Sequence, residues 1–174
     1  VRPRHDRPGP ASARCPSPAR AARPAAAGWP GAATHRSARR PMTGAATRFP
    51  FRFDAVFRPA LALLGVRSAT AWVAVSEREL LIRYGPWRLR TARDNVIAVE
   101  LSGPYRWWRA IGPHLSLADG GATFGSSAAG GICLRFGVPV PALLPGGRPR
   151  HPAATVTVAD PPALARLLAV PDLS

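Results

Sequence analysis

Residues 71–91, with the sequence AWVAVSERELLIRYGPWRLRT, decide the fold class of this chain. Residues 71–76 alternate in character and are rich in β-branched side chains, and residues 79–84 place Leu80 and every second residue after it on one face. A period of two is typical of a strand that buries one of its faces. The short polar link between the two runs therefore predicts an antiparallel hairpin.

A third strand is predicted directly after this hairpin. The Gly-Pro pair at 85–86 is a strong turn signal. Beyond it, Trp87 and Leu89 face one way, whereas Arg88 and Arg90 face the other way. The three strands together predict a sheet with one apolar face.

The rest of the folded part continues this strand-and-turn pattern. Further strand patterns occur at residues 49–53, 96–101, 114–118, 122–124, 132–136 and 155–158. A short helix is predicted at residues 59–64, where a proline stands near the start and Gly65 marks the stop. Residues 138–151 are rich in proline and glycine, which predicts an ordered loop.

The chain closes with an amphipathic helix that begins at Asp160, a residue suited to the N-cap. Leu164, Leu167 and Leu168 share one face of it. The predicted fold class is therefore mainly β (β-rich α+β), with about seven antiparallel strands followed by a C-terminal helix. This order is the one expected of a pleckstrin-homology-like barrel, in which two sheets form a partly open barrel and the helix closes one end.

The N-terminal segment differs from this pattern. Residues 1–41 hold nine arginines, eight prolines and a single acidic residue, Asp6, which is a composition that cannot bury enough apolar surface to fold. The only methionine of the chain is Met42. We therefore expect residues 1–44 to be a disordered tail or sequence upstream of the true translation start, and residues 45–174 to form a single domain.

The net charge of +15 is weak evidence for a nucleic-acid partner. All 24 basic residues are arginine, and the chain is also rich in alanine and proline, as the proteins of a GC-rich genome are. The arginine content therefore follows composition more than selection for a polyanion. Nucleic acid is an unlikely partner on this reasoning.

Residues 51–169 also resemble a family of small uncharacterised proteins of GC-rich actinobacteria. The resemblance rests on the segments RFDAVFRPALALLGV, LIRYGPWRLRT, SGPYRWWRAIGPHLSLAD and TVTVADPPALARLLA. It implies a single domain and supplies no catalytic residue.

The strongest candidate for a binding site is the run GPYRWWRAIGPHLS at residues 103–116. Its arginines can hold an anionic group and its paired tryptophans offer a stacking face or a membrane-interface patch. In the alternative interpretation one tryptophan faces the core and the other covers the end of the barrel, and strand register alone would decide which. The candidate residues are Arg106, Trp107, Trp108, Arg109 and His114.

A second candidate pattern involves Arg88 and Arg90 together with Arg78. Their spacing loosely resembles the basic hairpin of phosphoinositide-binding pleckstrin-homology domains. Glu77 and Glu79 flank Arg78, so the positive potential that such a pocket needs is partly cancelled.

No pattern predicts catalysis. His114 and Ser116 share a strand face, but no third group is placed to orient the imidazole. His114, Cys133 and His151 lack the spacing of zinc ligands, and the glycines between 120 and 131 match no phosphate-binding fingerprint. We therefore predict a protein that is not an enzyme and uses no metal or cofactor.

These observations favour a cytoplasmic, non-catalytic module that binds another protein. The chain shows neither the apolar core of a secretory signal nor an apolar run of membrane-spanning length, and its two cysteines are too few for a disulfide framework. Two alternatives stay open: a peripheral module that binds anionic lipid through residues 106–109 and the Arg88/Arg90 strand face, and a calycin-like barrel that carries a small apolar ligand.

Overall fold

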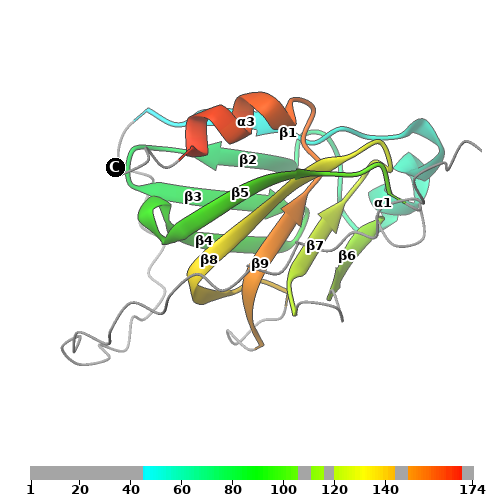
Figure 1. Ribbon diagram of the computed structural model, residues 1–174. Helices are drawn as coiled ribbons and strands as arrows, with labels where there is room; N and C mark the ends of the chain where they lie inside the picture. Colours follow the sequence, from blue (N-terminus) through cyan, green and yellow to red (C-terminus); the bar gives the residue numbers. More distant parts are fainter. Residues whose placement is uncertain (1–44, 106–110, 116–119, 144–148, 170–174) are drawn as a thin grey trace, which may run out of the picture.

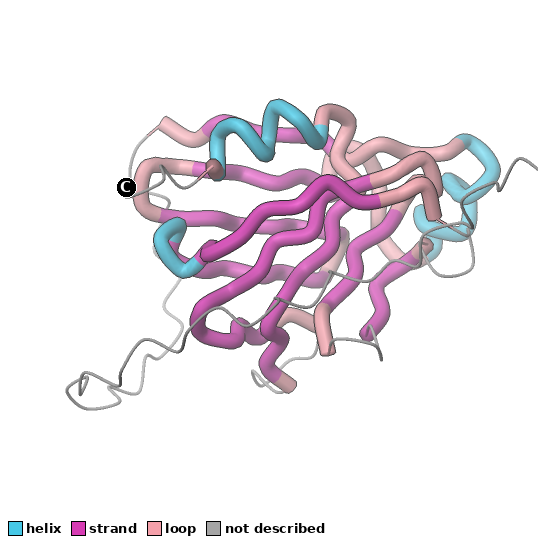
Figure 2. The backbone as a smooth tube through the Cα atoms, viewed as in Figure 1, coloured by secondary structure: helices cyan, strands magenta, loops and turns pink. Residues whose placement is uncertain are grey.

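The computed structural model describes residues 45–105, 111–115, 120–143 and 149–169, and its nine strands there form two sheets (Figure 1). The first sheet has the order β1 (Thr47–Pro50), β2 (Ala71–Val75), β3 (Glu79–Tyr84), β4 (Trp87–Ala92). The second has the order β5 (Val96–Ser102), β8 (Gly131–Pro141), β9 (Arg150–Val156), β7 (Ala122–Gly125), β6 (Gly112–Leu115). The two sheets face each other with their strands crossing (Figures 1 and 2).

Residues 71–92 form the meander that their alternation predicts. Strands β2 to β4 pair antiparallel, with Val73 opposite Ile82 and Ile82 opposite Leu89. All three of these side chains are fully buried. The apolar half of each strand therefore faces the second sheet, and the other half faces away from it.

The second sheet differs from the predicted arrangement in two respects. Strand β8 extends to Pro141 and β9 already begins at Arg150, so both enter the stretch predicted as a loop, and the described residues contain nine strands where about seven were expected. Strand β9 also lies between β8 and β7 and runs parallel to β7, so the sheet is not wholly antiparallel. Sequence patterns indicate strands but not which strand inserts between two others.

Short helical elements connect and cover the sheets. The 3₁₀ turn η1 (Ala55–Phe57) leads into α1 (Arg58–Leu63), and η2 (Arg93–Asn95) links β4 to β5. The C-terminal helix α3 (Pro161–Leu168) begins as predicted, because the Asp160 carboxylate accepts a hydrogen bond from the N–H of Ala163 at 2.9 Å. Leu164 and Leu168 are buried, and α3 packs against β5 and β8.

The extended segment after β1 joins the two sheets. The N–H of Phe51 bonds the carbonyl of Ala71 in the first sheet, and the N–H of Arg52 bonds the carbonyl of Thr157, just beyond β9. The segment ends at Asp54, whose two carboxylate oxygens accept hydrogen bonds from the Ser127 hydroxyl and the Ala128 N–H, both at 2.8 Å. One chain segment thus pairs with both sheets and closes this side of the molecule.

A second link between the sheets lies in the core. Tyr84 is fully buried on β3, and its hydroxyl donates to the carbonyl of Gly125 on β7 at 2.5 Å. Its ring packs between Phe51 and Phe124, with ring centroids 5.1 and 5.7 Å away. Burial raises the pKa of this phenol well above its usual value, because the charged form would lose its hydration.

We predict that Asp54→Asn lowers the free energy of unfolding by about 1–3 kcal/mol, because the amide cannot accept both hydrogen bonds and leaves a buried donor without a partner. The matched control is Asp94→Asn, which removes the same charge at an exposed position and should change stability by less than about 0.5 kcal/mol. Urea denaturation of the two variants checks this. Equal effects would contradict a specific role for the Asp54 carboxylate.

We also predict that stability falls at alkaline pH. The pKa of Tyr84 is raised in the folded state, so the phenol stays protonated there while the unfolded chain ionises above about pH 10. The free energy of unfolding should be flat below that pH and should then fall by up to about 1.4 kcal/mol per pH unit from this residue. Tyr84→Phe should have a shallower slope in the same denaturation series; an unchanged slope would show that Tyr84 is not the cause.

Candidate functional site

Four arginines and a tryptophan cover the outer face of the first sheet. Because Val73, Ile82 and Leu89 point inward, the residues that alternate with them point away from the second sheet. This set, called the arginine face below, consists of Arg48 on β1, Trp72 on β2, Arg83 on β3, and Arg88 and Arg90 on β4. Arg48, Arg88 and Arg90 are exposed, whereas Trp72 and Arg83 are half-buried.

Strand register brings these side chains into rows across the sheet. Trp72 lies opposite Arg83, and Arg83 lies opposite Arg88. Like charges directly opposite each other on paired strands repel and destabilise the sheet. The sheet therefore holds two cations next to each other at a cost to its own stability.

The tryptophan of this face already has a cation on its ring. The guanidinium carbon of Arg48 lies 4.3 Å from the centroid of the Trp72 ring, within the range of a cation–π contact. This contact holds Arg48 in place over the sheet. It also occupies the ring face on which a nucleic-acid base would stack.

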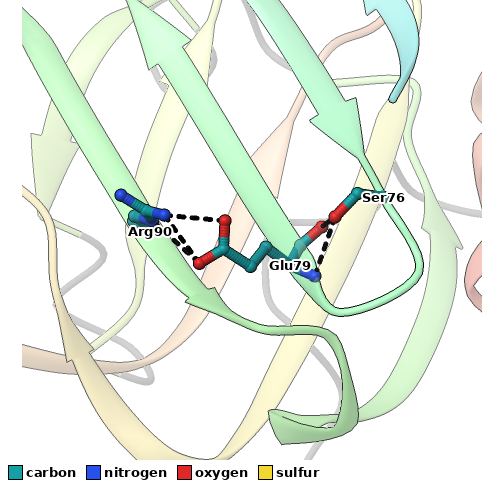
Figure 3. A network of polar contacts seen from close by, with 3 residues as sticks. All are labelled: Ser76, Glu79 and Arg90. Atoms are coloured by element: carbon teal, nitrogen blue, oxygen red, sulfur yellow. Dashed lines mark hydrogen bonds and ion pairs between the residues drawn. The ribbon is translucent and has the colours of Figure 1, made fainter. Parts of the chain in front are cut away.

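One carboxylate neutralises part of the face. Glu79 forms an ion pair with Arg90, in which both carboxylate oxygens of Glu79 lie 2.7 Å from Nη2 of Arg90 (Figure 3). Glu79 is itself held at the β2–β3 turn, because the N–H of Glu79 donates to the Ser76 hydroxyl at 3.0 Å. Four arginines against one glutamate leave the face with a charge of +3.

The other three arginines keep their charge uncompensated. Among the residues that the structure describes, Arg48, Arg83 and Arg88 form no ion pair. The Nε of Arg83 is buried and has no hydrogen-bond partner. Strand pairing fixes the backbone that carries these cations, and the contact with Trp72 also holds the Arg48 side chain.

The site residues predicted from the sequence lie in different parts of the fold. Arg88 and Arg90 do lie on the arginine face, while Arg78 lies in the turn between β2 and β3. His114 lies on β6 in the other sheet, where its Nδ1 is 3.2 Å from the Gly112 carbonyl oxygen. Residues 106–109, which include both tryptophans of the strongest sequence candidate, lie outside the described residues.

Sequence reasoning missed Arg48, Trp72 and Arg83. Trp72 and Arg83 each stand between two buried residues of an alternating strand, so the alternation alone predicts that their side chains point outward. Their proximity was not, because it depends on the register of three strand pairs. Arg48 was missed because β1 begins at Thr47, two residues before the aromatic pattern at 49–53.

A shallow groove lies beside the start of α3. It has a volume of about 210 Å³, and it is lined by Arg52, Leu101, Ser102, Ala129, Gly130, Gly131, Val158, Ala159, Pro161 and Pro162. The helix start offers no free donor there, because two prolines lack an N–H and Asp160 already caps Ala163. The polar side chains of the lining are Arg52 and Ser102, and the Ser102 hydroxyl is already hydrogen-bonded to that of Tyr105, so few donors are left to orient a polar ligand.

The described residues supply no metal centre and no membrane-spanning element. No three metal-ligating side chains within them come close enough together to hold an ion. None of the helices among them is both long and apolar enough to cross a bilayer.

A scan against protein-family models gives no match to this chain. Searches of curated proteins and of solved structures likewise return no match. The functional argument therefore rests on the chemistry of the described surfaces.

We predict opposite effects of two substitutions on β4 that each replace a charged arginine with neutral glutamine. Arg88→Gln relieves the repulsion with Arg83 and should raise the free energy of unfolding by about 0.2–1 kcal/mol at low salt. Arg90→Gln removes the ion pair with Glu79 and should lower it by up to about 1 kcal/mol. Both changes remove one charge from the same strand face. A difference between their free energies of unfolding, measured by urea denaturation, therefore reports the neighbours of each arginine and not the total charge. A gain in both variants would mean that only total charge matters.

Proposed function

We propose that this protein is a non-catalytic binding module that docks an acidic protein surface on its arginine face. The observation that carries the proposal is a set of three arginines, Arg48, Arg83 and Arg88, which lie on one sheet face and form no ion pair with any other residue that the structure describes. Carboxylates of a partner would offset the repulsion between Arg83 and Arg88. Binding thereby relieves a repulsion that destabilises the free protein, and this relief adds to the affinity.

A protein partner is favoured over nucleic acid. A single-stranded nucleic acid needs open aromatic faces for its bases, and the ring of Trp72 is covered by Arg48. An acidic protein surface needs only fixed cations at spacings that match its carboxylates. The arginine face supplies fixed cations and no open stacking platform.

The proposed fold is a pleckstrin-homology-like barrel in which residues 45–174 form one domain. Two facing sheets, the crossing segment between them and the C-terminal helix support this assignment. The parallel pair of β7 and β9 departs from the antiparallel order expected of that fold. A cytoplasmic location, the absence of an enzymatic activity and the origin of residues 1–44 stay predictions from the sequence.

The calycin-like carrier finds little support in the described interior. The largest fully buried side chains include Tyr84, Phe124, Leu89 and Ile132, which fill the space between the sheets. A carrier of small apolar ligands would need that space to be open.

The test uses a fluorescein-labelled peptide of alternating glutamate and alanine, with its glutamine version as a control. In fluorescence anisotropy, the double variant Arg83→Gln/Arg88→Gln should bind the acidic peptide at least about tenfold more weakly, a loss of about 1.4 kcal/mol. The double variant Arg58→Gln/Arg67→Gln removes the same charge from other exposed positions and should bind within about twofold of the unchanged protein.

Equal losses in the two double variants would contradict the proposal, because they would show that the peptide responds to net charge and not to the arginine face. Binding of the glutamine peptide as tightly as the acidic one would contradict it as well.

A further inference from the structure

The segment formed by η1 and α1 exposes an unusual amount of apolar surface. Val56 is 74% exposed, Leu63 is 90% exposed and Leu64 is 47% exposed. Only Leu61 of the six residues of α1 is buried. A surface helix normally turns polar residues toward water, whereas here the solvent side presents Pro59, Ala60 and Leu63.

Core packing and backbone hydrogen bonds anchor this segment, so its exposed side chains do not belong to an unanchored loop. Leu61 and Val66 are each 1% exposed and belong to the main core. The N–H of Val66 bonds the carbonyl of Leu61 at 2.9 Å, and the N–H of Phe57 bonds the carbonyl of Asp54 at 3.1 Å. Asp54 is fixed in turn by Ser127 and Ala128.

The charged residues between Asp54 and Glu77 in the sequence are both arginines. Arg58 and Arg67 flank it and are exposed. No acidic residue occurs in the sequence between Asp54 and Glu77, and the Asp54 carboxylate is occupied by two hydrogen bonds. Exposed leucine and valine side chains next to arginines match the two layers of an anionic membrane surface, acyl chains below and phosphates above.

We propose that the η1–α1 segment inserts Val56, Leu63 and Leu64 into the interfacial layer of an anionic lipid bilayer, while Arg58 and Arg67 contact the lipid headgroups. The segment lies at one end of the molecule, where Figure 1 shows α1 beyond the ends of the sheet strands. A projecting apolar end suits a fluid interface, which needs no complementary pocket.

A second copy of the chain is the less suitable occupant. A stable protein interface covers about 800 Å² on each partner, more than three side chains provide. Two copies meeting through this end would also bring two pairs of arginines together. The bilayer gains from both the apolar and the charged part of the surface, so it is the occupant we infer.

This membrane contact is independent of the arginine face and differs from the one expected from sequence. The sequence predicts lipid binding at residues 106–109 and at Arg88 and Arg90. Three inserted side chains with two cations should give weak, reversible binding that depends on salt, comparable with a single lipid anchor.

The test is flotation with vesicles of phosphatidylcholine that contain phosphatidylserine, compared with vesicles of phosphatidylcholine alone. The unchanged protein should float with the anionic vesicles at low salt and release from them at high salt. Val56→Ser/Leu63→Ser should lower the partition coefficient at least about tenfold. The matched control, Ile97→Ser/Val138→Ser, alters side chains that are 60% and 64% exposed elsewhere and should stay within about twofold.

Charge variants separate this site from the arginine face. Arg58→Gln/Arg67→Gln should lose its preference for anionic over neutral vesicles. Arg83→Gln/Arg88→Gln should still float with the anionic vesicles and should lose only its binding of the acidic peptide. The proposal is overturned if the unchanged protein does not float, or if Val56→Ser/Leu63→Ser floats as well as the control. A dimer in sedimentation that Val56→Ser/Leu63→Ser dissociates would assign the surface to a second copy and would overturn it too.

Discussion

The hydrogen bonds of the segment from Phe51 to Asp54 are the constraint on which the rest of the structure depends. The segment pairs with β2 on one side and with Thr157 on the other, and its end is fixed by the Asp54 carboxylate. Beside this crossing, the N–H of Ala159 bonds the carbonyl of Pro50, and the Tyr84 hydroxyl adds a hydrogen bond between the sheets in the core. The same segment sets the position of β1, which carries Arg48, and of α1, which carries the apolar surface.

Both proposed surfaces are features that a sheet and a helix optimised for stability alone would not keep. Arg83 and Arg88 face each other across two paired strands, and Leu63 stands almost wholly in water. Each feature costs the free protein some stability, and each has chemistry that a partner can complete. A core filled by large side chains supplies the rigidity that lets the surface carry these costs.

Local patterns predicted strands β2 to β4 and the final helix well, because hairpin partners are adjacent in sequence and the cap and apolar spacing of a helix lie within the helix itself. The alternation of β2, β3 and β4 and the turn at Gly85 determine the strands and the face of the sheet that each residue takes. The second sheet was predicted less well. Strand β9 inserts beside β7 after a long connection, and no local pattern indicates a partner about 30 residues away. The candidate site was predicted only at Arg88 and Arg90, because the other members join them through strand register and through β1, which pairs with β2 across the intervening α1.

The sequence by itself determined that this chain is strand-rich, that residues 71–92 form a meander with an apolar and a basic face, and that Asp160 begins a closing helix. These features follow from side-chain period and capping, which act over a few residues. Only the tertiary structure decided that Arg48 and Trp72 join Arg83 and Arg88 on one surface, and that Leu63 is left outside the core. Those outcomes depend on strand register and on which helix face meets the sheets, which are settled when distant segments pack together.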